Sequence, residues 1–101
     1  MIGGLHLNGA ATCYRSITGW IDLFTMATDD LNRRYPDRVD DNSRAAVLKP
    51  KAEGERIRRD VLDHLHGNLT SASPNMIELG RAVRSYGLWV EGFMKTLLGP
   101  S

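Results

Sequence analysis

The sequence has a single cysteine, no long apolar run and almost no net charge, and each shortage excludes a class of protein. Cys13 cannot form an internal disulfide, so we expect a reducing, cytoplasmic compartment. No run of 18 apolar residues is present, which argues against a transmembrane helix. Residues 1–8 lack the basic region and apolar core of a signal peptide. A net charge of +1 offers no general surplus of cations for nucleic acid.

The length and the missing motifs limit the chemistry further. A chain of 101 residues and 11.2 kDa supports one domain, 1–101, with a folded surface of roughly 5,700 Å² and a thin core. The serine-hydrolase, phosphate-loop, dinucleotide and zinc-protease signatures are absent. We therefore expect neither an enzyme nor a bound cofactor.

Apolar residues that recur three and four positions apart predict an all-α domain of three helices. We expect two long amphipathic helices over 9–34 and 74–98, and a shorter charged helix over 50–67. The segment 35–48 is rich in charge and turn-forming residues and predicts a loop, with a separate helical turn over 44–48 as the alternative. Residues 1–8 are either a short strand, which would pair with something such as a second copy of the chain, or an unordered terminus.

The first helix has clear end signals and a wide apolar face. Asn8 is a good N-cap, and Pro36 biases Tyr35 away from helical geometry. The apolar arc covers roughly half of the circumference, more than one neighbouring helix needs, so we expect contact with two elements. The seam consists of Tyr14, Ile17, Ile21, Phe24, Thr28, Leu31 and Tyr35.

The other two helices also carry end signals. Pro50 suits the first turn of the second helix, and Gly67 with Asn68 suits its C-cap. Ser73 predicts the N-cap of the third helix, with Pro74 at its first position. The third seam consists of Met76, Leu79, Val83, Tyr86, Val90, Phe93 and Leu97.

Glycines recur along the third helix, with Gly80 and Gly87 seven residues apart, as are Gly92 and Gly99. Each interior glycine costs about 1 kcal/mol relative to alanine. Either another backbone approaches the helix closely at these positions, or the cost is simply tolerated.

The residues that most often carry chemistry favour structural roles. His64 and His66 point about 200° apart on a helix, and no further ligands accompany them, so we expect no metal site. Cys13 has no base beside it in the sequence and lies next to an apolar seam, so we expect a core residue.

Charge is concentrated in the middle of the chain, where residues 29–63 carry nine acidic and nine basic side chains. We expect this segment to form a solvent-exposed face with ion pairs between successive helical turns. Its basic side chains are interleaved with acidic ones, which cancels most of their field. DNA binding is therefore the less favoured function.

The apolar surface of the first and third helices exceeds what the charged helix can cover. Uncovered apolar surface on a soluble protein marks an interface, and aromatic residues and methionine carry interface energy. Core packing alone is the other interpretation of these aromatics. We predict a protein-binding surface, with self-association into a homodimer, formed by Trp20, Phe24, Tyr86, Trp89, Val90, Phe93, Met94 and Leu97.

The chain resembles the small quorum-sensing anti-activators, which bind LuxR-type transcription factors and keep them off DNA. The resemblance lies in Ser73-Pro74-Asn75-Met76-Ile77, which opens the last helix, and in Leu97-Leu98-Gly99-Pro100, which closes the chain. It implies an all-α dimer that covers the dimerisation surface of a regulator. The last helix is also similar to those of type III secretion inner-rod subunits.

Together these features predict a non-enzymatic regulator that inhibits another protein by covering its surface with apolar helices. The alternatives are a structural subunit or chaperone of a secretion apparatus, or a phage-type inhibitor. We expect no direct contact with nucleic acid or with a membrane.

Overall fold

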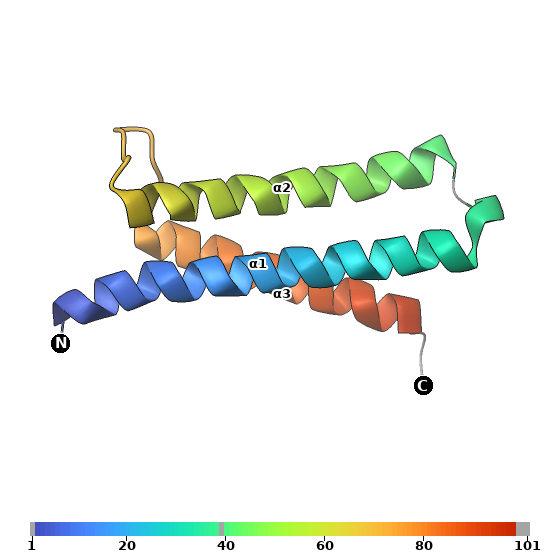
Figure 1. The fold of residues 1–101 in the computed structure, drawn as a ribbon, viewed down its shortest axis with the longest axis horizontal. Helices are drawn as coiled ribbons and strands as arrows, with labels where there is room; N and C mark the ends of the chain where they lie inside the picture. Colours follow the sequence, from blue (N-terminus) through green and yellow to red (C-terminus); the bar gives the residue numbers. More distant parts are fainter. Residues whose placement is uncertain (1, 39, 99–101) are drawn as a thin grey trace.

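The structure is a three-helix arrangement, which confirms the predicted all-α class. It consists of α1 (Ile2–Arg34), the 3-10 helix η1 (Pro36–Arg38), α2 (Asp41–His66) and α3 (Met76–Leu98), with no strand in the described residues (Figure 1). This computed structural model describes residues 2–38 and 40–98. Side chains are described for these residues except 2–8, 43, 97 and 98.

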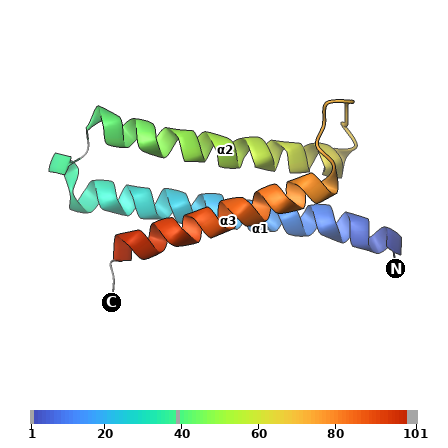
Figure 2. The same cartoon turned by 180° about the vertical axis from the view of Figure 1, so that it is seen from behind.

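The helices run up, down and up, so that α1 and α3 point the same way and α2 points the opposite way (Figure 1). As predicted, α1 packs against both other helices, whereas α2 and α3 contact each other least. Seen from behind, α3 begins beside the end of α2 and crosses in front of α1 (Figure 2). The helices α2 and α3 therefore diverge toward the end at which α3 finishes.

The core follows the predicted seams closely. Each helix contributes residues spaced three and four apart, which places them on one face. Tyr35, the last residue of the first seam, is instead exposed. The buried apolar residues are Ala10, Ile17, Ile21 and Phe24 on α1, Ile57 and Val61 on α2, and Leu79, Val83, Tyr86 and Val90 on α3.

The N-terminal prediction was wrong, because α1 extends back to Ile2 and Asn8 lies inside it. A lone strand would leave its backbone groups without a ladder partner, whereas a helix pairs them internally. In the sequence, Leu5 and Leu7 alternate with a polar residue, but this pattern is too short to distinguish a strand from a helix. Met1 lies outside the described residues.

The loop predicted over 35–48 is mostly helix. Only η1 and its flanks separate α1 from α2, and α2 begins at Asp41 and runs through Pro50. Proline in a helix interior costs about 3 kcal/mol because it removes a donor and crowds the preceding turn. Val47 packs against the core, and the Tyr86 hydroxyl donates to the Pro50 carbonyl at 3.1 Å. These tertiary contacts offset the local penalty, which the sequence pattern alone did not show.

The C-cap of α2 was predicted correctly, and the N-cap of α3 was not. Gly67 has φ 71°, and the Asn68 N–H donates to the Asp63 carbonyl at 2.9 Å, which forms a Schellman motif. At α3 the cap is Asn75, whose Oδ1 accepts from the Glu78 N–H at 2.8 Å, while Glu78 Oε2 accepts from the Asn75 N–H at 3.3 Å. This reciprocal capping box outcompetes the predicted Ser73 cap.

The molecule is long and flat, with axis extents of 51 × 29 × 17 Å. Its radius of gyration is 15.8 Å, against about 13 Å for a compact domain of this length. Its accessible surface is 7462 Å², roughly 30% more than its mass predicts. Three helices in this arrangement therefore leave an unusually large surface uncovered.

Candidate protein-binding groove

An extensive hollow lies where α2 and α3 diverge, and we call it the open-end groove. The C-terminal half of α1 forms its floor, and the start of α2 and the end of α3 form its walls. Its volume is about 810 Å³. The groove is lined by Phe24, Thr28, Leu31, Asn32, Tyr35, Arg38, Arg44, Ala46, Val47, Leu48, Trp89 and Phe93.

Three aromatic rings form a continuous apolar surface in this groove. The Trp89 and Phe93 rings are stacked, with centroids 5.5 Å apart and 17° between their planes. Both rest on Phe24, at 5.4 Å and 5.1 Å, in tilted arrangements. Phe24 is fully buried and anchors the cluster, whereas Trp89 is 45% exposed. The cluster therefore offers aromatic surface that is rigid and still accessible, the combination typical of an interface anchor.

The rim of the groove is apolar and basic. Leu48 is 65% exposed and Tyr35 is 47% exposed. The Arg38 guanidinium lies over the Tyr35 ring, 5.4 Å from its centroid, and Arg44 lines the α2 wall. No carboxylate is among the lining residues. The charged side chains that line the groove are therefore both basic, although the whole chain is almost neutral.

The groove continues past Trp89 along the seam between α2 and α3. This second hollow has a volume of about 510 Å³ and is bounded by Lys49, Glu53 and Tyr86, among others. Trp89 lines both spaces. The apolar track is therefore longer than the open-end groove alone.

The predicted interface residues divide into three groups. Trp89 and Phe93 line the groove, as an interface requires. Phe24, Tyr86 and Val90 are 1%, 6% and 0% exposed and lie in the core, and Phe24 also forms part of the floor of the groove. The aromatic residues that suggested an interface lie on the same three-four seams that pack the helices together, so one sequence cannot separate the two roles.

Trp20 and Met94 do not line the groove. Trp20 lies against Gly87 of α3, and Met94 is half-buried against the core. Leu97 lies on α3, but its side chain is outside the described residues. Tyr35, Arg38 and the α2 wall of the groove were not predicted as interface residues, because the segment 35–48 was expected to be a loop. The adjacent apolar residues Val47 and Leu48 were the available signal.

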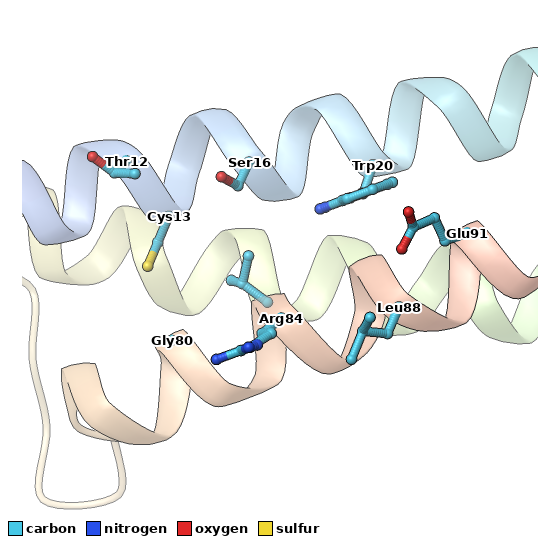
Figure 3. A pocket seen from close by; sticks show the side chains of 9 residues that line it. Thr12, Cys13, Ser16, Trp20, Gly80, Arg84, Leu88 and Glu91 are labelled. Atoms are coloured by element: carbon cyan, nitrogen blue, oxygen red, sulfur yellow. The ribbon is translucent and has the colours of Figure 1, made fainter.

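A smaller hollow lies on the opposite side of α3, between that helix and α1 (Figure 3). Its volume is about 350 Å³, and Cys13, Trp20, Gly80, Arg84 and Glu91 are among its lining residues. Burial raises the pKa of the Cys13 thiol, which keeps it protonated and poorly nucleophilic. This agrees with a packing role for the cysteine.

The glycines of α3 have different surroundings. At Gly87 an added Cβ would lie 2.5 Å from Trp20 Cε2, so a close approach explains this glycine, although a side chain makes it rather than a backbone. At Gly80 and Gly92 an added Cβ would meet open space. Gly99 lies outside the described residues.

The histidines and the charged segment behave as surface features. His64 Nε2 lies 2.6 Å from the Pro74 carbonyl oxygen and so ties the end of α2 to the following loop. Arg56 pairs with Glu53 at 2.6 Å and with Asp60 at 3.4 Å on an exposed face, and the hydrogen bond from Arg56 lowers the pKa of Glu53. Within the described ranges, no three His, Cys, Asp or Glu side chains are placed to share a metal ion.

Comparisons with known proteins supply no relative. No protein-family model, curated protein or solved structure matches the chain. No helix in the part of the chain that the structure describes is long and apolar enough to cross a membrane. A function is therefore inferred from the surface of the molecule itself.

Proposed function

We propose that this chain is a non-enzymatic protein-binding module whose open-end groove takes one amphipathic helix of a partner protein. The observation that supports this most is the exposed aromatic surface of Trp89 and Phe93 over a buried Phe24. A fourth helix laid in the groove would cover these rings and complete a four-helix packing layer.

The chemistry of the groove describes the partner helix. Its apolar stripe would face the aromatic floor, with residues at helical spacing entering between the walls. Its flank would carry Asp or Glu, because the lining residues of the groove include Arg38 and Arg44 and no acidic residue. Such complementarity favours association and orientation more than it adds affinity.

Binding of this kind inhibits by occlusion. The apolar face of a helix bound in the groove is buried. The partner protein therefore loses any other contact that this face makes. The resemblance to quorum-sensing anti-activators narrows the partner to a LuxR-type transcription factor whose dimerisation helix would be covered. A secretion-apparatus protein is the alternative partner.

The decisive experiment uses designed helical peptides, because they test the groove without knowledge of the natural partner. Three peptides of about 20 residues would share one composition of apolar residues: an acidic-flanked helix, a basic-flanked helix and a scrambled acidic sequence. We expect the acidic-flanked helix to bind most tightly by calorimetry, with affinity that falls as salt rises. If none binds, or if the scrambled peptide binds equally well, the proposal is wrong.

Variants locate the binding. Leu48→Glu places a charge on the apolar wall at a residue already exposed, so the fold should persist while acidic-peptide affinity falls at least about tenfold. Met26→Glu is the matched control, because Met26 is 69% exposed and does not line the groove. Equal losses for both variants would contradict the assignment of the groove.

The proposed inhibition of a transcription factor is tested by capturing the binding partners from a lysate of the source cell. Wild type and Leu48→Glu would be compared by pull-down and mass spectrometry. A transcription factor retained by wild type and lost from Leu48→Glu supports anti-activation. Secretion-apparatus proteins with the same dependence would favour the alternative.

A further inference from the structure

The outer face of α3 carries exposed apolar side chains between charged ones. This face lies opposite the buried seam of the helix, and its residues are spaced three and four apart. Leu88 is 61% exposed and Ile77 is 69% exposed. The outer face consists of Ile77, Arg81, Arg84, Leu88, Glu91 and Lys95.

Two opposite charges flank Leu88 on the same edge of this face. Arg84, Leu88 and Glu91 all line the hollow between α1 and α3 (Figure 3). At about 100° per residue, Arg84 and Glu91 lie about 40° and about 60° around the helix from Leu88 in the same direction, which is the direction of Gly87. Gly87 faces Trp20 of α1, so both charges lie on the α1 side of Leu88. They are seven residues apart, which is about 10.5 Å along a helix. Neither has an ion-pair partner among the described residues.

This spacing has a simple symmetry. A two-fold axis perpendicular to α3 that passes between Gly87 and Leu88 places a second α3 antiparallel to the first. It brings Arg84 of one copy level with Glu91 of the other, and the reverse pair forms by the same operation. This rotation leaves the α1-side edges of the two outer faces on the same side of the contact. Arg84 of one copy and Glu91 of the other therefore lie next to each other. Arg81 and Lys95 lie a turn farther from the axis.

We propose that the chain forms an antiparallel homodimer through the outer faces of two α3 helices. Leu88 lies beside the axis and packs against the second copy. Trp20, half-buried on Gly87 at the adjacent edge, adds apolar surface to the contact. The occupant is a second copy because one surface supplies both members of each ion pair.

The dimer leaves the open-end groove free. Trp89 follows Leu88 directly, and successive helical residues point about 100° apart. The dimer surface and the groove therefore lie on different sides of α3, and one dimer presents two grooves. This inference does not depend on the proposed function, since a monomer could still bind a helix and a dimer could form without one.

Sedimentation equilibrium of the full chain across a concentration series tests the proposal. Arg84→Glu turns both pairs into Glu–Glu contacts, and Glu91→Arg turns both into Arg–Arg contacts. We expect either change to raise the dimer dissociation constant roughly tenfold or more at low salt. The double variant Arg84→Glu/Glu91→Arg exchanges the charges and should restore dimerisation close to that of wild type.

The control is Arg59→Glu, an equivalent charge reversal on the exposed side of α2, which should leave dimerisation unchanged. Circular dichroism checks that every variant is folded, and all three altered positions are exposed. A wild type that stays monomeric at millimolar concentration overturns the proposal. So does a dimer that ignores the single reversals, or a double variant as weak as its parents.

Discussion

Replacing Gly54 by alanine tests how α3 is held against the middle of the bundle. Gly54 is buried on α2, and an added Cβ would lie 2.7 Å from the Tyr86 Cζ and hydroxyl oxygen and 2.9 Å from Ile21 Cγ1. Both neighbours are core side chains on other helices. The methyl group therefore has no space unless Tyr86 or Ile21 moves.

The expected change in the free energy of unfolding combines one stabilising and two destabilising contributions. Alanine improves helix propensity by about 1 kcal/mol. Overpacking of a core costs about 1–3 kcal/mol, and displacing Tyr86 breaks its hydroxyl bond to the Pro50 carbonyl, worth about 1 kcal/mol. The sum predicts that Gly54→Ala lowers the free energy of unfolding by about 1–3 kcal/mol.

Urea unfolding followed by circular dichroism measures this change. Gly92→Ala is the matched control, because it replaces a glycine in a helix where an added Cβ meets open space. That variant should gain about 0.5–1 kcal/mol from propensity alone. If Gly54→Ala stabilises the protein as much as Gly92→Ala does, the tight packing of Tyr86 over α2 is refuted.

Three further changes test local features. Asn75→Ala removes the cap of α3 and should lower the free energy of unfolding by about 1 kcal/mol in urea titrations, whereas Ser73→Ala should cost less. Burial raises the pKa of Tyr86, so its contribution to stability is present below about pH 10 and is lost as pH rises through the folded-state pKa. Tyr86→Phe should therefore flatten the decline of stability above about pH 10, and an unchanged profile would contradict this. The Cys13 thiol should react with a disulfide reagent more slowly in the folded chain than in urea, and equal rates would show that it is not protected.

The three helices could be predicted from sequence because their seams repeat over several turns. The buried residues Ile17, Ile57 and Val83 all lie on predicted seams. The end signals at Pro36 and Gly67 were also reliable, because backbone geometry at those positions is set by the residue itself. Local chemistry and tertiary packing agree at these places.

The errors occurred where tertiary contacts outweigh local preference. Pro50 argued for a helix start, but Val47 packs against the core one turn earlier and keeps α2 continuous. Gly54 gave no signal, because the side chains that require it come from α1 and α3. Contacts between helices are not encoded in the spacing of either helix alone.

The candidate site was predicted only in part for the same reason. Trp89 and Phe93 were found because aromatic residues are typical of interfaces. Their floor residue Phe24 is buried, and the second wall depends on the position of Leu48 after α2 folds back. A groove is a property of the angle between helices, which the apolar pattern does not specify.

In the proposed complex, a partner helix lies in the open-end groove against Trp89. The two tryptophans allow a direct test, because Trp89 lines the groove and Trp20 lines the hollow on the other side of α3. The measurement is a titration of the acidic-flanked helical peptide into isotope-labelled protein, followed by the two indole N–H resonances. We expect the Trp89 resonance to shift until the groove is saturated, while the Trp20 resonance stays nearly fixed. A shift of Trp20 alone, or no shift of either, would contradict it.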